Sequence, residues 1–407
     1  MIHTSVLKRV DFGENISERG LPLPAYKHQL FKYIYFLGFV TSKPLEITVN
    51  RFQFVKYFSN RSPFFRYVLL AGLISSCAVA IPVSVPGLIL RLFANQFRNV
   101  FGYSLPRKIL SHQDENRDKD NLKLMSWNVG LGPGYMSYDN RLNLPYKRIG
   151  AIIDQIVRQR PDVLALQEVL DPESRDMLVG RLSSLDYHCV HSVLAAGVCL
   201  SGGLLLAVRG HENKVRNVGV WKFTNLVNYD FWSNKGLLKM ELTIQHKILG
   251  EKKVTLFNTH LQSDYEGKLN YSKIRTEQIS AIMQEIGESQ AANVVLLADL
   301  NFSCYPLRNQ QPPSSVEYAQ SMKIIEGSGL LKNPNHEAQN SGNGSFYNFK
   351  GGTIERSRAV IDYILISPHL AQEGRTSEII PLEGKTSLEF ASDHTPITHE
   401  FSLASLR

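Results

Sequence analysis

The sequence predicts an α/β fold in which two layers of β-sheet form a core flanked by helices. Three observations support this. Short apolar, β-branched runs alternate with helically spaced apolar residues, they fill residues 122–407, and no internal repeat divides them. A segment of this length can bury one large core.

The predicted elements follow one another closely along this segment. Strands are expected at residues 122–129, 163–167, 203–208, 253–259, 293–297, 360–366 and 397–401. A helix is expected at 148–159, because Ile149, Ile152 and Ile156 recur at helical spacing, and another at 271–286. Strands with helices interposed favour sheets covered by helices.

The N-terminal third differs in charge and apolarity. The first 120 residues hold 16 Lys and Arg against 8 Asp and Glu, whereas the rest holds 29 of each. Tyr67–Leu90 is an uncharged stretch of 24 residues between Arg66 and Arg91. Its length suffices for a membrane-spanning helix, which takes about 20 residues. Because Pro82 and Pro86 would kink such a helix, a re-entrant hairpin fits as well, and a buried helix ending at Pro82 is a third alternative.

We therefore divide the chain into residues 1–105, a basic and hydrophobic region that associates with a membrane, a charged linker at 106–121 and a catalytic domain at 122–407. The four cysteines form no CxxC pair, which argues against a disulfide framework or a thiolate metal site. The first 30 residues lack the apolar run of a secretory signal. These features predict a membrane-associated protein whose catalytic domain lies in a reducing, cytosolic compartment.

Polar residues stand where the predicted strands end. Asn128, Glu168 and His260 each close an apolar run, and Asp299 and Asn301 follow another. The set also contains three residues near the C-terminus, namely Asp362, Asp393 and His394. Carboxylates and amides without cysteine suit Mg²⁺, or Mn²⁺ in its place, and histidines beside carboxylates suit a general base.

Six motifs carry these residues in a fixed order. They are SWNV (126–129), LQEV (166–169), NTHL (258–261), ADLN (298–301), IDYI (361–364) and SDHTPI (392–397). In this order they resemble the endonuclease/exonuclease/phosphatase superfamily. The resemblance implies a four-layer α/β sandwich with two central mixed β-sheets flanked by helices. Ala298 stands where the family has Gly, for which we expect a small backbone shift.

The resemblance also implies roles at the metal and at the base. Glu168 would be the main Mg²⁺ ligand with Asn128 beside it, and Asp393 would join a second metal site or support the first from outside. One or two metals therefore remain open. His394 would take a proton from the attacking water, and Asp362 would orient the imidazole.

Three further roles concern the phosphate. Asn301 and Asp299 would position the nucleophile and stabilise the in-line transition state, with Asp299 near the leaving oxygen. His260 would hydrogen-bond a phosphate oxygen.

Local features favour a lipid substrate. The stretch NYDFWSNKGLL (228–238) resembles the Ser-Lys-Gly stretch of neutral sphingomyelinases, with Asn234 inserted. In those enzymes an Asp lies five residues before the Lys, and Asp230 and Lys235 have the same spacing. Lys235 would offset phosphate charge while Asp230 holds it. The alternative is a surface ion pair near a turn. The stretch SGGLLLAVR (201–209) is similar to another sphingomyelinase segment.

The sequence thus predicts Mg²⁺-dependent hydrolysis of sphingomyelin to ceramide and phosphocholine at a membrane. One alternative is a phosphodiesterase or phosphatase that acts on a phosphoinositide, a lysophospholipid or nucleic acid, and another is an inactive membrane-binding module. Because residues 122–407 carry balanced charge, no nucleic acid is expected. An anionic phospholipid is expected as an activator through the basic N-terminal region, and the oligomeric state stays open.

Overall fold

The computed structural model describes residues 6–9, 82, 85–87, 101–104, 120–132, 142–192, 202–210, 213–265, 270–303, 314–334, 344–345, 347–348, 355–357, 359–373, 377–384 and 389–407. Most of the apolar segment 67–90 and of the linker 106–121 lies outside these residues, so both stay predictions. Among the described residues, no helix combines the length and the apolarity that crossing a membrane requires.

Two mixed β-sheets form the core. The seven-stranded sheet has the order β14 (Glu378–Ile379), β15 (Ile397–Ser402), β3 (Asn121–Leu131), β4 (Val163–Val169), β6 (Leu205–Arg209), β5 (Tyr187–Ser192) and β2 (Phe101–Ser104). The six-stranded sheet has the order β1 (Leu7–Arg9), β7 (Lys214–Phe223), β8 (Gly236–His246), β9 (Gly250–His260), β10 (Val294–Asp299) and β13 (Asp362–Ile366). In each sheet one pair is parallel, β3 with β4 and β9 with β10, and the other described pairs are antiparallel.

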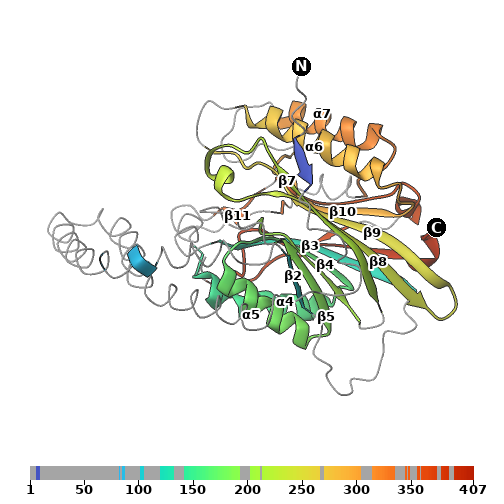
Figure 1. Cartoon of the computed structure of the whole chain (residues 1–407), viewed down its shortest axis with the longest axis horizontal. Helices are drawn as coiled ribbons and strands as arrows, with labels where there is room; N and C mark the ends of the chain where they lie inside the picture. The colour runs from blue at the N-terminus through green and yellow to red at the C-terminus, as the bar shows by residue number, and fades with distance from the viewer. Residues whose placement is uncertain are drawn as a thin grey trace.

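Helices cover the outer face of each sheet. Figure 1 shows α6 (Tyr271–Glu288) and α7 (Ser314–Gly327) over the six-stranded sheet, and α4 (Pro145–Gln159) and α5 (Pro172–Ser184) over the seven-stranded sheet. A small two-stranded ribbon, β11 (Tyr347–Asn348) with β12 (Glu355–Arg356), forms a sheet of its own. The predicted core of two sheets flanked by helices is confirmed.

The strands are apolar on both faces because each sheet is covered twice. On β3, Leu122 and Leu124 pack between the sheets, whereas Met125 and Trp127 pack against the helices. On β10, Val295 and Leu297 face the other sheet, whereas Val294, Leu296 and Ala298 join the cluster under α6 and α7. Alternation along each strand thus builds three apolar layers from continuous hydrophobic runs.

The layer between the sheets becomes polar towards one end. Gln167 Nε2 donates to Asn258 Oδ1 at 2.8 Å, and Asn258 Nδ2 donates to the carbonyls of Leu166 and Leu205, both at 2.9 Å. Asn258 belongs to β9, whereas its partners lie on β4 and β6 of the other sheet. Its fully buried amide therefore ties the two sheets together where the apolar core ends.

Two short strands come from the first 105 residues. Leu7 of β1 pairs with Phe223 of β7, and Ser104 of β2 pairs with Cys189 of β5. The region predicted to associate with a membrane thus also contributes an edge strand to each sheet.

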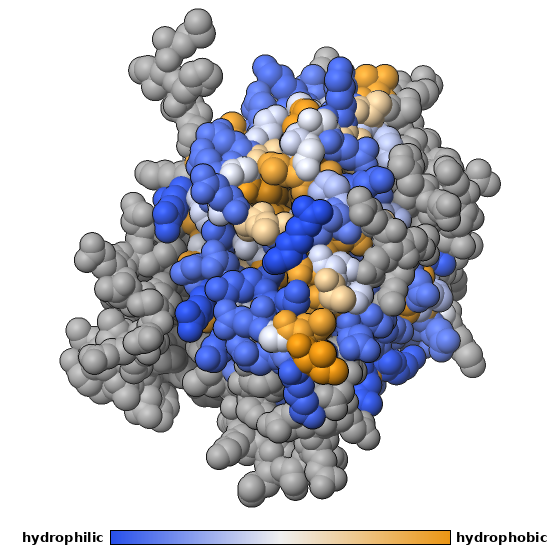
Figure 2. Space-filling view, turned by 90° about the vertical axis from the view of Figure 1, so that its right-hand side faces the viewer, coloured by the Kyte–Doolittle hydropathy of each residue, from blue (hydrophilic) through white to orange (hydrophobic). Residues whose placement is uncertain are grey.

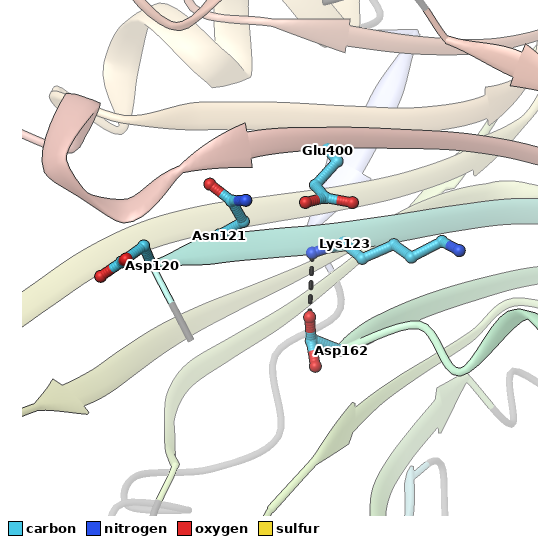
Figure 3. Close-up of a pocket in the computed structure, with 5 residues that line it drawn as sticks. All are labelled: Asp120, Asn121, Lys123, Asp162 and Glu400. Carbon is cyan, nitrogen blue, oxygen red and sulfur yellow. Dashed lines mark hydrogen bonds between the residues drawn. The ribbon is translucent and has the colours of Figure 1, made fainter. Parts of the chain in front are cut away.

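The opposite end of the sheets carries a hollow of about 260 Å³. Figure 3 shows its lining residues, which are Asp120, Asn121, Lys123, Asp162 and Glu400. Asp162 is already engaged, because it accepts hydrogen bonds from the Lys123 N–H at 2.9 Å and from Arg209 Nη2 at 2.6 Å. Figure 2 shows the same end as a mainly hydrophilic face with small hydrophobic areas. None of the predicted site residues lines this hollow.

Asn258→Ala should lower the free energy of unfolding by about 2–3 kcal/mol, because it leaves buried carbonyls and the Gln167 amide without their partner. Urea unfolding of the wild type and the variant measures the difference. Gln245→Ala, at an exposed position of the neighbouring strand β8, is the control and should leave the midpoint nearly unchanged. An equal effect of both substitutions would contradict the tie between the sheets.

Candidate active site

The structure brings the predicted site residues together at the end of the sheets beyond the polar layer. Asp299 of β10 lies opposite His260 of β9 in the parallel pair and opposite Asp362 of β13 in the antiparallel pair. Asn128 and Glu168 stand near the ends of β3 and β4 in the other sheet. Strand register, rather than nearness in sequence, therefore assembles the site.

Asn128 connects acidic residues of both sheets. Its Nδ2 donates to Glu168 Oε1 and to Asp299 Oδ2, both at 2.9 Å, while its Oδ1 accepts from the Gly130 N–H at 3.0 Å. In this arrangement Asn128 positions the carboxylates, and its predicted role as a metal ligand stays a prediction. The Glu168 side chain is 23% exposed, so it is the carboxylate that reaches the opening of the site.

Unusual backbone conformations aim side chains into the site. Glu168 has φ of 57°, which L-residues rarely adopt, and Asn301 has φ of 54°, which Asn tolerates better than most residues. The Asn301 N–H donates to Asp299 Oδ1 at 3.0 Å, so the turn after β10 fixes that carboxylate. Such strain costs on the order of 1–3 kcal/mol and persists where the surrounding structure enforces it, which is typical of functional sites.

Gly130 allows a left-handed backbone conformation beside Asp393. It has φ of 54°, and a Cβ at this position would lie 3.4 Å from Asp393 Oδ1. A side chain would thus combine backbone strain with a tight contact against the acid. Asp393 itself is 5% exposed, and Ser392 Oγ lies 3.5 Å from its Oδ1.

His394 and Asp362 form a buried pair. His394 Nδ1 lies 3.0 Å from Asp362 Oδ2 and 3.2 Å from Oδ1. Ser345 Oγ also donates to Asp362 Oδ2 at 2.6 Å, and Trp127 Nε1 donates to the His394 carbonyl at 2.8 Å. The imidazole is held at one nitrogen, which leaves Nε2 as the atom that can exchange a proton with a bound water.

Lys235 lines one wall of the candidate active site, beside His260. Its Nζ lies 2.9 Å from Asp230 Oδ2, from His260 Nε2 and from the Leu261 carbonyl, and 2.8 Å from Ser263 Oγ. Asp230 also accepts from the Ser263 N–H at 2.7 Å. Both side chains of the Asp230–Lys235 pair are 5% exposed. This is a buried ion pair that contacts the site, and not an exposed pair near a turn.

Asn301 continues the same wall. Its Nδ2 donates to the Leu261 carbonyl at 3.1 Å and lies 3.4 Å from Ser263 Oγ, which also contacts Lys235. Asn301, Lys235 and His260 therefore share one group of contacts.

Burial gives the acids unusual proton affinities. Burial raises the pKa of Glu168, and the charge of Asp393 raises it further, while the Asn128 hydrogen bond works against both. Burial, together with the charge of Asp362, raises the pKa of Asp299 to about 7. The site thus crowds more negative charge than its own cations balance.

The two histidines differ in the same environment. Burial lowers the pKa of His260 well below its usual range, and Lys235 and His394 lower it further, so His260 is neutral. Burial also opposes the charged form of His394. There, however, the charge and hydrogen bond of Asp362, with smaller effects from Asp299 and Asp393, raise the pKa well above its usual range.

The donor set fits a hard divalent cation. Among the described residues, Asp299, Asp362 and His394 offer ligand atoms within 4.8 Å of one another, and Glu168 lies nearby through Asn128. Since His394 Nδ1 already faces Asp362, we favour Glu168 as the principal ligand. A cation here would relieve the repulsion between carboxylates and weaken their pull on the His394 proton, which suits a general base.

Sequence reasoning missed Arg148. Its buried guanidinium donates to the carbonyls of Val129, Gly130 and Ala391, and so joins the turn after Asn128 to the turn before Asp393. Burial lowers its pKa to about 10, although nearby Asp393 and Glu168 favour the charged form. A signal existed, because Arg148 lies on the same helical face as Ile152 and Ile156, where a charge is unexpected.

Two other supporting residues were also missed. Ser345 bonds Asp362, and Tyr265 donates from its hydroxyl to Asp230 Oδ1 at 2.9 Å. Both lie in loops far in sequence from the residues they hold, and no motif marks them.

The comparisons with known proteins place the chain in a family. The sequence model of the Endonuclease/Exonuclease/phosphatase family matches residues 125–394, so the chain belongs to this family and has its phosphodiesterase fold. No curated protein matches the sequence significantly.

Solved structures share the fold at low identity. Beta toxin from Staphylococcus aureus with bound magnesium ions is 19% identical, with a TM-score of 0.51 over 69% of this chain and 99% of that one. Sphingomyelinase C from Streptomyces griseocarneus is 18% identical, with a TM-score of 0.50 over 70% and 100%. D. rerio TDP2 complexed with a single-strand DNA product is 20% identical, with a TM-score of 0.50 over 70% and 100%. Since a sphingomyelinase and a DNA-binding protein match equally well, the fold alone does not select the substrate.

Mg²⁺ should stabilise the folded protein through Glu168. At about 100 times its Kd, a ligand of the folded state adds about 2.7 kcal/mol, which raises the melting temperature by several degrees. Glu168→Gln should lose most of this gain. In EDTA it should be no less stable than the wild type, because the substitution removes a crowded charge.

Thermal melts with Mg²⁺ and with EDTA measure both effects, and Glu288→Gln at the exposed C-terminal end of α6 is the control. The same Mg²⁺-dependent shift in Glu168→Gln as in the wild type would rule out Glu168 as the principal ligand.

Asp362→Asn should lower the pKa of His394. The raised pKa means that the folded state binds this proton more tightly than the unfolded state, whose value is near 6.5. The resulting stability is present below that pH and is lost as the pH rises through the raised pKa. In Asp362→Asn the loss should still begin near pH 6.5 but end at lower pH, so less stability depends on this proton.

NMR titration in EDTA, following the imidazole signal that is absent from His394→Gln, measures this pKa directly. An unchanged titration in Asp362→Asn would mean that another group holds the proton on His394.

Proposed function

We propose that this protein hydrolyses sphingomyelin to ceramide and phosphocholine at a membrane surface with Mg²⁺ as cofactor. The observation that carries the proposal is the buried Asp230–Lys235 pair in contact with His260. Burying a charged lysine costs several kcal/mol unless it is paired, so such a pair in a site wall indicates a functional use for the charge. Its spacing matches that of the neutral sphingomyelinases, to which residues 228–238 are similar.

The residues divide the reaction between them. His394, held by Asp362, accepts a proton from the water that attacks phosphorus, and the bond between phosphorus and the ceramide oxygen breaks. Asp299 returns a proton to the departing ceramide oxygen. Asn301 and His260 orient phosphate oxygens, and Lys235 offsets their charge.

A bound Mg²⁺ at Glu168 would supply Lewis-acid neutralisation of the phosphodiester charge. Asn128 would keep the Glu168 carboxylate turned towards that position, and Asp393 would add negative charge behind it. Arg148 would hold the two turns that carry Asn128 and Asp393 at a fixed distance.

A lipid substrate also gives a reason for the N-terminal third. Its basic residues and its uncharged stretch at 67–90 would keep the protein on a membrane and raise the effective concentration of a membrane-bound substrate. The balanced charge of residues 122–407 supports a neutral headgroup over a polyanion.

The test is release of phosphocholine from sphingomyelin vesicles with Mg²⁺ or with EDTA, beside phosphatidylcholine vesicles. Release should require both Mg²⁺ and sphingomyelin. Lys235→Ala should lower kcat by about 100-fold or more, because it removes charge that stabilises the transition state. Lys239→Ala, four residues along β8 and more exposed, should leave kcat nearly unchanged.

Other outcomes select other functions. Mg²⁺-dependent turnover of phosphoinositides or of single-stranded DNA, with none of sphingomyelin, would keep the enzyme class and overturn the substrate. No turnover of any phosphodiester would favour a membrane-binding module without activity.

A further inference from the structure

Three large aromatic side chains stand exposed on one short turn beside the site. This aromatic turn consists of Tyr229, Phe231 and Trp232 in the 3₁₀ helix η1 (Asn228–Trp232). Their exposed fractions are 73%, 56% and 48%. Scattered single exposed hydrophobic residues are ordinary, but three aromatic rings within four residues form a patch that points to an interaction.

The aromatic turn is joined to the site wall. Asp230, in the middle of the turn, points inward to Lys235 while its neighbours point outward. The Tyr229 ring packs edge-to-face on Tyr265 with centroids 5.3 Å apart, and the Tyr265 hydroxyl bonds Asp230. Phe231 and Trp232 pack edge-to-face at the same separation. Whatever contacts the aromatic turn therefore lies directly beside the candidate active site.

The chemistry of the turn favours a lipid surface. Tyr and Trp, with an apolar ring and a polar group, gather at the boundary between headgroups and acyl chains. A surface that stacks nucleic-acid bases combines aromatic rings with Lys and Arg. Residues 223–234 contain neither, and the one acid among them, Asp230, is buried in its ion pair.

We propose that the aromatic turn docks the catalytic domain onto a zwitterionic lipid surface by inserting Phe231 and Trp232 among the headgroups. This deepens the proposed function and rests on it, since it would bring the opening of the site to the membrane that holds the substrate. Because the one charge of the turn, Asp230, is buried in its ion pair, this contact is nearly independent of salt, unlike binding through the basic N-terminal region.

Tryptophan fluorescence reads this contact locally in the full-length protein. The chain has three tryptophans, of which Trp127 and Trp221 are buried at 0% and 6% exposure, so Trp232 provides the solvent-sensitive emission. Vesicles of sphingomyelin and phosphatidylcholine should shift the emission to the blue. Phosphatidylcholine with brominated acyl chains should quench it, and both effects should persist in high salt.

Two variants make the readout specific. Trp232→Phe keeps an aromatic ring but should lose the quenching. Adding Ile248→Trp to it moves the reporter to the β8–β9 turn at the opposite end of the sheets, where Ile248 is 87% exposed, and this tryptophan should stay unquenched. Figure 1 shows that hairpin at the end of the sheets remote from the strand ends that form the site.

Three outcomes would overturn the proposal. One is unquenched Trp232 in protein that sediments with the vesicles. Another is quenching by single-stranded oligonucleotides and not by lipid. A third is Trp232 emission that is already shielded from iodide without vesicles, which would mean that another segment of this chain covers the turn.

Failure of docking and failure of the proposed function are distinguishable. Phe231→Ser with Trp232→Ser should lower turnover of vesicle sphingomyelin on the order of tenfold, by the loss of apolar burial. Turnover of a short-chain sphingomyelin dissolved as monomers should stay within about twofold, since both side chains are about half exposed and pack on each other. A wild type that turns over neither substrate refutes the function, while quenching of Trp232 still decides the docking.

Discussion

The amide nitrogen of Asn128 is the contact on which the site depends. It donates to Glu168 in its own sheet and to Asp299 in the other. One nitrogen atom thus hydrogen-bonds two carboxylates that belong to different sheets. This is feasible only because Asn258 and Gln167 tie the sheets one layer deeper. The separation of the sheets, set by their apolar core, thereby becomes the width of the candidate active site.

The charged residues of the candidate active site are arranged in a way that favours function over the stability of the fold. Burial raises the pKa values of Glu168 and Asp299, and Glu168 adopts a strained backbone conformation near the end of β4. The buried charges and the backbone strain destabilise the domain, and its three apolar layers offset this effect. A cation among the carboxylates would restore part of the stability of the folded state, which couples metal binding to folding.

Substrate selection depends on features outside the shared fold. Solved structures with this architecture include a sphingomyelinase and a protein with bound DNA product, so the fold is compatible with different substrates. In this chain the distinguishing elements lie between β7 and β8. There, one short turn carries a buried acid that faces Lys235 and aromatic rings that face outward. The same few residues thus connect the site wall to the molecular surface.

The sequence alone determined the two-sheet core and predicted most residues of the candidate site. Short apolar, β-branched runs predicted the buried strands, and the order of six motifs identified the family and residues such as Glu168 and Asp299. Helix α5 was missed although Asp171 and Pro172 signal its start, because its apolar pattern is weak. Only the tertiary structure decided that Asn128 donates to carboxylates from both sheets, that Asp230 and Lys235 are buried, and that Arg148 joins two turns. Each of these depends on strand register and on the packing of distant loops, which no local pattern encodes.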